Sequence, residues 1–328
     1  MLDGKTILIT GGTGSFGQHC CHKILSQHNP AKVIVLSRDE LKQSEMAALP
    51  HFRDKRLRFF LGDVRDKERL YLAMNDVDYV IHAAALKQVP AAEYNPHEFI
   101  KTNINGATNV VEAALRCGVK RIIALSTDKA VNPINLYGAT KLCSDKIFIA
   151  GNSYSGKRET RFSVVRYGNV IGSRGSVIPI FLKQKESGEL TVTKPGMTRF
   201  LITISDGVDF ALRSLADMAG GEIFIPKIPS CSIGDLAKAI APECKIKIIG
   251  LRPGEKLHEC MVPADESEYC LEQDNRFIIE PASPYWEYDR ERYKGKTCPE
   301  GFSYSSDTNE EQMSIADIKK LIANYKTV

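Results

Sequence analysis

The sequence lacks several features that would place it in a large class of proteins. It contains no apolar run close to the roughly 20 residues that a membrane-spanning helix needs. No block of Lys and Arg forms a stripe for nucleic acid, and the net charge is only +4. The first five residues lead directly into a predicted strand, so we expect no signal peptide. These absences predict a cytoplasmic protein that binds neither membranes nor nucleic acid.

The nine cysteines also lack any paired spacing. No C-x-x-C occurs, and Cys20 and Cys21 are adjacent within a predicted helix, which suits neither a disulfide nor a metal knuckle. The seven histidines show no ligand spacing either. We therefore predict reduced thiols and no metal site.

The first half of the chain alternates short β-branched runs with helical patterns. Continuous apolar strands separated by helices indicate a parallel sheet that is covered on both faces. The fold class we predict is α/β, with a doubly wound parallel sheet of the Rossmann type. The strands are expected at 6–10, 33–36, 57–61, 77–82, 121–125 and 162–166, and the helices at 16–25, 68–74, 98–117 and 136–151.

A glycine-rich stretch lies between the first strand and the first helix. Its form is G-x-x-G-x-x-G, in which Gly11 permits a tight turn, Gly14 lets the backbone approach a pyrophosphate, and Gly17 allows close helix–strand packing. Glycines also mark ordinary turns, but here the required strand–loop–helix context is present. The predicted cofactor contacts of this loop are Gly11, Thr13, Gly14, Ser15, Phe16 and Gly17.

The end of the second strand indicates which dinucleotide binds. An acidic residue there usually takes the ribose of NAD, whereas Arg accommodates the phosphate of NADP. Ser37, Arg38 and Lys42 are placed to surround a phosphate, while Asp39 is expected to cap the helix that begins near Glu40. This favours NADP over NAD; the alternative is a solvated charged turn.

Two further strand ends complete the predicted cofactor groove. Asp63 and Val64 follow the third strand and are placed to meet the adenine. Ala83 begins a small-residue floor at the switch point of the sheet, where ligands bind in such folds.

Beyond residue 166 the pattern is less regular, with helices expected at 178–186, 206–219, 233–240 and 307–325 and a strand at 245–249. We predict an NADP-binding domain over 1–167, with 200–225 packing back on it. The remaining 168–328 would form a smaller α/β substrate-binding lobe built from several segments, with a C-terminal tail helix.

Tyr137 and Lys141 are four residues apart and share one face of a predicted helix. A phenol is a poor base at neutral pH, but a nearby ammonium and the positive nicotinamide would lower its pKa. Tyr137 can then take a hydroxyl proton while hydride leaves the same carbon. Lys141 can also hold the ribose, and Thr127 can hydrogen-bond the same oxygen. The alternative is a buried Tyr beside a snorkelling Lys.

With these residues the chain resembles the extended short-chain dehydrogenase/reductase family, which acts mainly on nucleotide sugars. It more closely resembles the inverting UDP-N-acetylglucosamine (UDP-GlcNAc) 4,6-dehydratases, the first enzymes of pseudaminic acid synthesis. Retaining enzymes carry Thr-Asp-Glu where this chain has Thr127-Asp128-Lys129. The resemblance rests on the stretches 83–90, 126–130, 197–200 and 251–259.

The resemblance implies oxidation at C4, elimination of water across C5 and C6, and return of hydride to C6. Lys129 is then the candidate C5 base and Asp128 the candidate C6 acid. Burial would tune both toward neutral pH, although their proximity opposes the two shifts. A surface ion pair is the alternative. Returning a proton to the other face of C5 would invert that carbon.

The resemblance also implies contacts to the sugar nucleotide. Lys87 would contact cofactor and substrate, and Asn169 would meet the diphosphate. Arg199 and Arg252 are candidates for phosphate pairing, because a guanidinium matches phosphate geometry. Glu255 would meet a ribose hydroxyl or orient Arg252, and a structural ion pair between these two is equally compatible with the sequence.

Together these features predict a dehydratase that converts UDP-GlcNAc to a UDP-2-acetamido-2,6-dideoxy-4-keto-L-hexose and keeps its NADP bound. Three alternatives stay open: a retaining dehydratase, a 4-epimerase, and a non-catalytic NADP-binding regulator. The resemblance implies a homo-oligomer, with a hexamer as one candidate.

Overall fold

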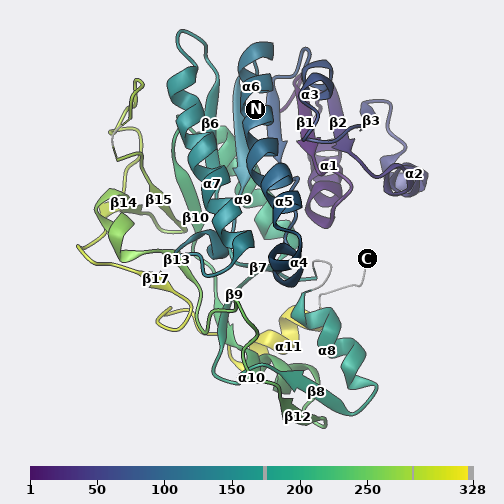
Figure 1. The fold of residues 1–328 in the computed structure, drawn as a ribbon, viewed down its shortest axis with the longest axis vertical. Coiled ribbons are helices and arrows are strands. Elements are labelled where there is room, and N and C mark those ends of the chain that lie inside the picture. The colour runs from purple at the N-terminus through teal and green to yellow at the C-terminus, as the bar shows by residue number, and fades with distance from the viewer. Residues whose placement is uncertain (173–175, 283, 324–328) are drawn as a thin grey trace.

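The computed structural model describes residues 1–172, 176–282 and 284–323. Its centre is a ten-stranded sheet in the order β16-β14-β15-β10-β6-β5-β4-β1-β2-β3, which Figure 1 shows spread from left to right behind a layer of helices. The strands are β1 (Thr6–Thr10), β2 (Lys32–Ser37), β3 (Leu57–Leu61), β4 (Tyr79–His82), β5 (Arg121–Leu125), β6 (Arg161–Val165), β10 (Ile223–Pro226), β14 (Cys270–Glu272), β15 (Arg276–Ile279) and β16 (Lys296–Thr297).

The predicted doubly wound sheet is confirmed. All neighbours from β3 to β10 pair in parallel, and the order reverses beside β1, which lies between β2 and β4. Ile7, Leu8 and Ile9 of β1 are fully buried, as expected for a strand covered on both faces. The reversal creates a crevice at the carboxyl ends of β1 and β4.

Three strands at the far edge of the sheet were not predicted. β15 pairs antiparallel with β10, and β14 and β16 continue the antiparallel edge. These strands are two to four residues long, too short for a clear alternation of apolar and polar residues.

Helices cover both faces of the sheet. α3, α6 and α7 pack side by side, and α1 packs against α9. The two groups lie on opposite faces, because the right-handed crossovers after β1 and β3 run in opposite directions along the sheet. The helices are α1 (Ser15–Gln27), α2 (Glu40–Ala48), α3 (Lys67–Ala73), α4 (Val89–Tyr94), α5 (Pro96–Phe99), α6 (Gly106–Cys117), α7 (Leu136–Gly151), α8 (Val177–Lys185), α9 (Ile204–Asp217), α10 (Ile233–Ile240) and α11 (Ile315–Ala323).

The predicted single helix at 98–117 is instead three helical segments. A π-helix, η2 (Ile100–Asn105), separates α5 from α6. Within it the amide of Asn103 accepts from Leu86 N at 2.9 Å and donates to Leu86 O and to Thr140 Oγ1. This side chain therefore fastens the loop after β4 to α7, which is a packing role.

The C-terminal helix is shorter than predicted. α11 begins at Ile315, where Ser314 and Asp317 cap each other's backbone amides, and residues 307–314 are not helical. Residues 324 and 325 of the predicted helix lie outside the described residues.

A smaller part of the molecule lies below the sheet in Figure 1 and has its own apolar core, in which α8, α10 and α11 pack around β8 and β9. Its strands form small sheets: β7 (Asn169–Val170), β9 (Thr198–Ile202) and β11 (Ser230–Ser232) in one, and β8 (Glu189–Val192) with β12 (Lys245–Ile248) in another. β13 (Cys260–Val262) pairs with β17 (Tyr304–Ser305). Among the described residues no helix is long and apolar enough to cross a bilayer.

Gly138 of α7 shows how tightly the helix packs against the segment after β5. A Cβ on Gly138 would overlap the carbonyl oxygen of Lys129 and lie 3.0 Å from Pro133 Cβ. Gly207 of α9 is a matched contrast, since a Cβ there would meet only Ile202 Cδ1, at 3.9 Å.

We predict that Gly138→Ala lowers the free energy of unfolding by about 1–3 kcal/mol, the usual cost of overpacking. Gly207→Ala should instead raise it by about 0.5–1 kcal/mol, because it removes backbone freedom from the unfolded chain without a clash. Urea unfolding of both variants measures the difference. Equal effects of the two substitutions would contradict this view of α7.

Candidate functional site

A cavity of about 730 Å³ lies at the carboxyl ends of the central strands, between the sheet and the smaller part of the molecule. Every residue that the sequence analysis assigned to cofactor, substrate or catalysis lines this cavity, with one exception. The exception is Asp128, whose side chain is fully buried behind the wall. The fold therefore brings residues from between Gly11 and Glu259 to one space.

The glycine loop has the shape that a dinucleotide requires. Gly11 adopts φ +65°, and a Cβ there would lie 2.9 Å from the backbone of Ala84. A Cβ on Gly17 would lie 2.5 Å from Gly12 Cα, so the helix and the loop touch. Gly14 precedes α1 and has no side chain that could cap the helix. The backbone N–H groups in the first turn of α1 can therefore bind an anion. These residues fit a dinucleotide pyrophosphate.

The segment after β2 places its charges as predicted. Asp39 Oδ1 accepts from Lys42 N at 3.0 Å, which confirms that Asp39 caps α2. Asp39 does not line the cavity, whereas Arg38 and Lys42 do. Ser37 lies 2.7 Å from Thr13 through their hydroxyls. Basic groups therefore dominate this end of the cavity.

Asp63 balances part of that charge. Its Oδ2 lies 3.8 Å from Arg38 Nη1 and 2.8 Å from Arg65 Nη2. Asp63 and Val64 both line the cavity next to the glycine loop.

Tyr137 and Lys141 project from α7 into the cavity wall, and both are nearly buried. Burial raises the pKa of Tyr137 to about 12, and the ammonium of Lys129 and the hydroxyl of Thr127 offset only part of this. Burial also lowers the pKa of Lys141, with Asp145 opposing the shift. Among the protein groups, the Lys129 ammonium therefore acts in the expected direction on the Tyr137 pKa, but desolvation outweighs it.

Asp128 and Lys129 form an ion pair directly after β5, on η3 (Asp128–Ala130). Lys129 Nζ donates to Asp128 Oδ1 at 3.0 Å, and Thr127 Oγ1 donates to the same oxygen at 2.9 Å. Lys129 Nζ also lies 3.4 Å from Asn169 Oδ1. Because Asp128 is fully buried, the alternative of a surface ion pair is wrong.

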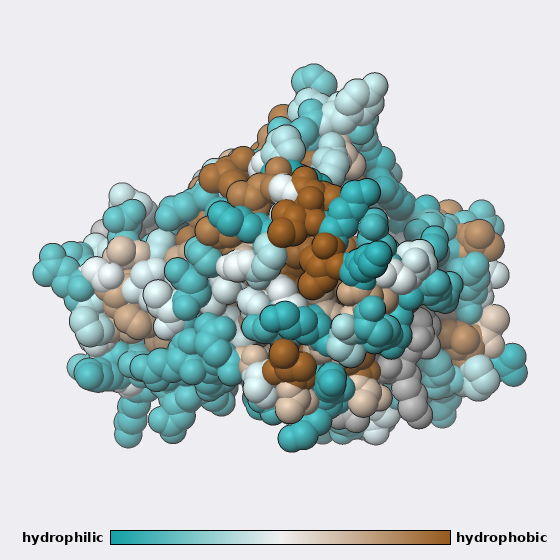
Figure 2. Space-filling model, turned by 90° about the horizontal axis from the view of Figure 1, so that it is seen from below, coloured by the Kyte–Doolittle hydropathy of each residue, from teal (hydrophilic) through white to brown (hydrophobic). Residues whose placement is uncertain are grey.

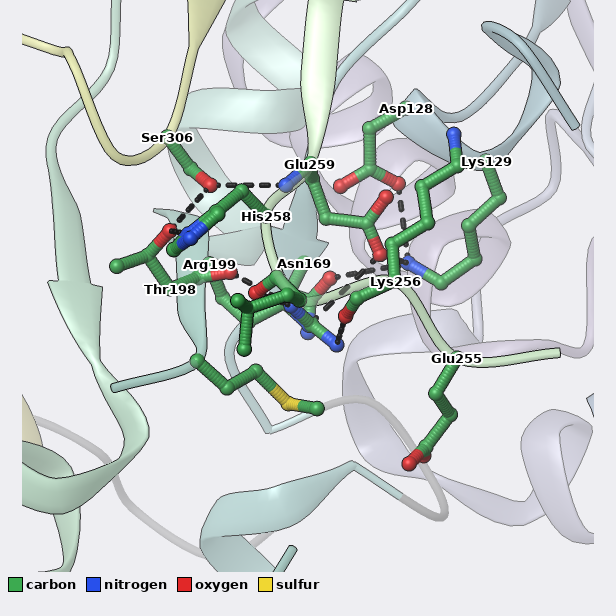
Figure 3. A network of polar contacts seen from close by, with 12 residues as sticks. Asp128, Lys129, Asn169, Thr198, Arg199, Glu255, Lys256, His258, Glu259 and Ser306 are labelled. Carbon is green, nitrogen blue, oxygen red and sulfur yellow. Dashed lines mark hydrogen bonds and ion pairs between the residues drawn. The ribbon is translucent and has the colours of Figure 1, made fainter. Parts of the chain in front are cut away.

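A second carboxyl group, that of Glu259, also faces Lys129. Its Oε1 lies 3.4 Å from Lys129 Nζ, and Figure 3 shows both carboxyl groups directed toward the ammonium. Burial lowers the pKa of Lys129, but Asp128 and Glu259 outweigh it and hold that pKa above its usual value. Burial thus acts on Lys129 in the expected direction, but the net pKa shift is upward because the expected opposition of Asp128, joined by Glu259, prevails.

Arg199 uses its guanidinium on the protein itself. Its Nη1 donates to the carbonyls of Thr198 and Leu257, and its Nη2 donates to that of Lys256 at 2.9 Å. Its Nε lies 3.7 Å from Glu259 Oε1. Arg199 lines the cavity, but its donors hold the loop that carries Glu259.

Arg252 and Glu255 lie on the same loop and pair with each other at 2.6 Å. The Arg252 side chain is 59% exposed, so its guanidinium is open to the cavity. Lys87 also lines the cavity, and burial, with help from Lys129, lowers the pKa of its ammonium. The structural ion pair considered from the sequence is therefore present, and Arg252 still reaches the cavity.

The loop 251–259 is fastened to the catalytic segments. Asn135, which caps α7, donates from Nδ2 to Gly254 O at 2.8 Å, and Lys256 Nζ donates to Val131 O. The sequence predicted no role for Lys256 or Glu259, although both lie in the stretch 251–259 that carries the resemblance. In the sequence, the one indication that the Glu259 side chain is buried is the apolar run 260–262 that follows it.

Comparisons with known proteins agree with this architecture. The family model described as "Polysaccharide biosynthesis protein" matches residues 7–281. The chain is 54% identical to the inverting UDP-N-acetylglucosamine 4,6-dehydratase of Campylobacter jejuni subsp. jejuni serotype O:23/36 (strain 81-176), over 98% of each chain. It is 40% identical to the UDP-glucose 4-epimerase of Rickettsia bellii (strain OSU 85-389), over 100% of this chain and 98% of the epimerase.

A solved structure shares the fold. DesIV, the dTDP-glucose 4,6-dehydratase of Streptomyces venezuelae, was solved with NAD bound and is 25% identical, with a TM-score of 0.69 over 77% of this chain and 86% of DesIV. The family model covers most of the chain and the two sequence relatives cover nearly all of it. The chain therefore belongs to the polysaccharide biosynthesis protein family.

Proposed function

We propose that this protein is a UDP-GlcNAc 4,6-dehydratase that inverts C5. The observation that carries the proposal is Lys129, which lies on the wall of the cavity that also contains Tyr137, Lys141 and the glycine loop. Thr-Asp-Lys, rather than the Thr-Asp-Glu of retaining enzymes, supports inversion, and so does the 54% identity to an enzyme with that name. The product would be a UDP-2-acetamido-2,6-dideoxy-4-keto-L-hexose for pseudaminic acid-type synthesis.

The cofactor of the proposal is a nicotinamide dinucleotide, held by the glycine loop, Asp63 and Val64, with Ala83 as the floor. NAD in DesIV supports this class of cofactor. NADP is favoured because Asp39 is turned into a helix cap while Arg38 and Lys42 face the cavity. When bound there, this cofactor would supply the acceptor and the later donor of the hydride.

Tyr137 takes the proton of the C4 hydroxyl, with Thr127 hydrogen-bonded to the phenol. Its pKa of about 12 in the buried site means that a positive charge must approach before the phenolate forms at neutral pH. Lys141, buried on the same helix face, would hold the ribose of the cofactor, and the positive nicotinamide would supply the approaching charge.

Lys129 then moves the C5 proton, which a ketone at C4 makes acidic. Its ammonium must first give up a proton, against the attraction of Asp128 and Glu259. Asp128 is the acid of this proposal, and Thr127 and Lys129, which donate hydrogen bonds to its carboxyl group, both line the cavity.

On the substrate side, Asn169, Lys87 and Arg252 are the proposed contacts to the sugar nucleotide, and Glu255 orients Arg252. Arg199 contributes by holding the loop 251–259 through its carbonyls. We keep the division into 1–167 with 200–225, and 168–328. Two apolar cores support a division into two parts, but the buried residues between 261 and 304 belong to the core of the large sheet, which β10, β14, β15 and β16 also join.

We also propose a cytoplasmic homo-oligomer, with a hexamer as one candidate. Figure 2 shows apolar side chains gathered on the face below the sheet, where α8, β12 and the segment after it lie. An exposed apolar patch of this kind supports a contact between subunits. The exposed apolar residues of these segments are Ile180, Ile246, Ile248, Ile249 and Leu251.

A 4-epimerase is the second candidate, favoured by the 40% identity to the Rickettsia bellii enzyme. An epimerase returns hydride to C4 and needs no acid or base at C5 and C6. Asp128 and Lys129 would then have no catalytic role. A retaining dehydratase would leave C5 unchanged.

We predict that the protein, incubated with UDP-GlcNAc, forms a 4-keto sugar whose C6 is a methyl group. NMR of the product measures this directly. A product that keeps its C6 hydroxyl, such as the C4 epimer, would refute the proposed dehydratase.

We further predict that Lys129→Ala and Tyr137→Phe block different steps. Lys129→Ala removes the group at C5 and should reduce deuterium uptake from D₂O at C5 by at least about 100-fold, the usual contribution of a general base, while cofactor binding is retained. Tyr137→Phe should block C4 oxidation and hence every later step. If Lys129→Ala keeps the exchange, Lys129 is not the base.

A further inference from the structure

Asn135 bonds with its one side chain to two different parts of the site. Its amide oxygen accepts from Gly138 N at 2.8 Å and so caps α7, whose second residue is Tyr137. Its amide nitrogen donates to Gly254 O at 2.8 Å, in the loop 251–259. Asn135 therefore joins the helix that carries the proposed C4 base to the loop that carries two of the proposed substrate contacts.

The loop approaches Asn135 as closely as a residue without a side chain allows. Gly254 has φ +77°, in the left-handed region that favours glycine. A Cβ on Gly254 would lie 2.9 Å from Asn135 Cβ and 3.4 Å from Val89 Cγ1. Any other residue at this position would push the loop away from α7, so glycine keeps the carbonyl within reach of the Asn135 amide.

The same loop presents a tight turn to the cavity. Glu255 N donates to Arg252 O at 3.1 Å, and Pro253 followed by Gly254 with positive φ is the pattern of a type II turn. The side chains of Arg252 and Glu255 pair across this turn, and all four of its residues line the cavity. A ligand group that binds this turn therefore acts on the segment whose carbonyl Asn135 bonds.

Further contacts hold the beginning of α7 to its surroundings. Lys256 Nζ, from the same loop, donates to Val131 O in the segment before α7. The N–H of Leu136, the first residue of α7, donates to Glu93 Oε1 on α4 at 2.8 Å. The position of this first turn is thus set by α4 and by the loop 251–259 as well as by its own cap.

We propose that Asn135 is a positioning residue that ties the first turn of α7 to the turn 252–255. Binding of the nucleotide part of the substrate to that turn then places Tyr137 for oxidation at C4. Binding energy from a part of the substrate that does not react is in this way used to orient the part that does. This inference rests on the proposed function, in which Arg252 contacts the sugar nucleotide.

Asn135→Ser tests the link without removing the helix cap. Asn, Asp and Ser cap helices about equally well, but a Ser that caps Gly138 N has no amide to offer Gly254 O. At saturating UDP-GlcNAc, the rate constant for formation of the reduced nicotinamide, followed by stopped-flow absorbance, should fall about 10- to 100-fold, the usual cost of misplacing a reacting group. KM should stay within about twofold of the wild-type value, because the nucleotide contacts remain.

Asn135→Asp is the second variant, since it keeps the size and the cap and also lacks the donor. It should show a loss of the same order. Asp adds a negative charge near Tyr137, which Ser does not, so a loss confined to Asn135→Asp would be an effect of charge and would overturn the proposal. A raised KM with an unchanged rate constant in Asn135→Ser would overturn it as well.

A double-mutant cycle with Arg252→Ala separates one linked effect from two independent ones. In the wild-type background, Arg252→Ala should raise KM and also lower the rate constant at saturating substrate, because the nucleotide no longer acts on the turn. In the Asn135→Ser background it should raise KM but lower the rate constant no further. Losses in the rate constant that multiply would show independent roles and contradict the link.

Asn309→Ser is the matched control. Asn309 has the same pair of contacts, since its Oδ1 accepts from Glu311 N at 3.3 Å and its Nδ2 donates to Ile228 O at 3.0 Å. It does not line the cavity, so Asn309→Ser should keep the wild-type rate constant and KM.

The proposed function fails on a different reading, namely a wild-type product that keeps its C6 hydroxyl. If the wild-type product has lost that hydroxyl and Asn135→Ser matches the wild-type rate constant, only the role of Asn135 falls.

Discussion

The contact of one ammonium with two buried carboxyl groups is the interaction on which this site depends. Lys129 would be a poor base anywhere that its charge is stabilised, and here Asp128 and Glu259 both stabilise it. Glu259 is buried, and its burial raises the pKa of its carboxyl group. The proposed role of Lys129 therefore depends on how these two carboxyl groups share the charge of the site.

The topology of the chain makes that contact possible. Lys129 follows β5 and faces the cavity at the carboxyl end of the sheet, while Glu259 precedes β13 and is held by Ser306 beside β17. Arg199 of β9 and Asn135 of α7 fasten the intervening loop from both sides. The packing of α7 against the carbonyl of Lys129, where Gly138 leaves no space for a Cβ, fixes Tyr137 relative to the ion pair. Tyr137, the residue proposed for C4 oxidation, and Lys129, the residue proposed for proton transfer at C5, are therefore held at a fixed spacing.

Features coded by neighbouring residues were predictable from the sequence. Several elements have the predicted bounds, among them β1, β5 and α7, and Asp39 caps α2 as its position next to Glu40 indicates. The π-helix at 100–105 was not predictable, because the contacts of Asn103 with Leu86 and Thr140 that accompany it arise only in the folded chain. The same holds for Glu259, whose neighbours in space lie far away in sequence, and for the pKa of Lys129, which depends on that contact.

We propose that Lys129, held between two carboxyl groups, moves the proton at C5 and that this carbon is inverted. The most direct measurement is NMR of the product that the wild-type enzyme forms from UDP-GlcNAc in D₂O. The expected product carries one deuterium at C5, a C6 methyl group, and the L configuration at C5. A product with protium at C5, or with unchanged C5 configuration, would show that Lys129 does not act in this way.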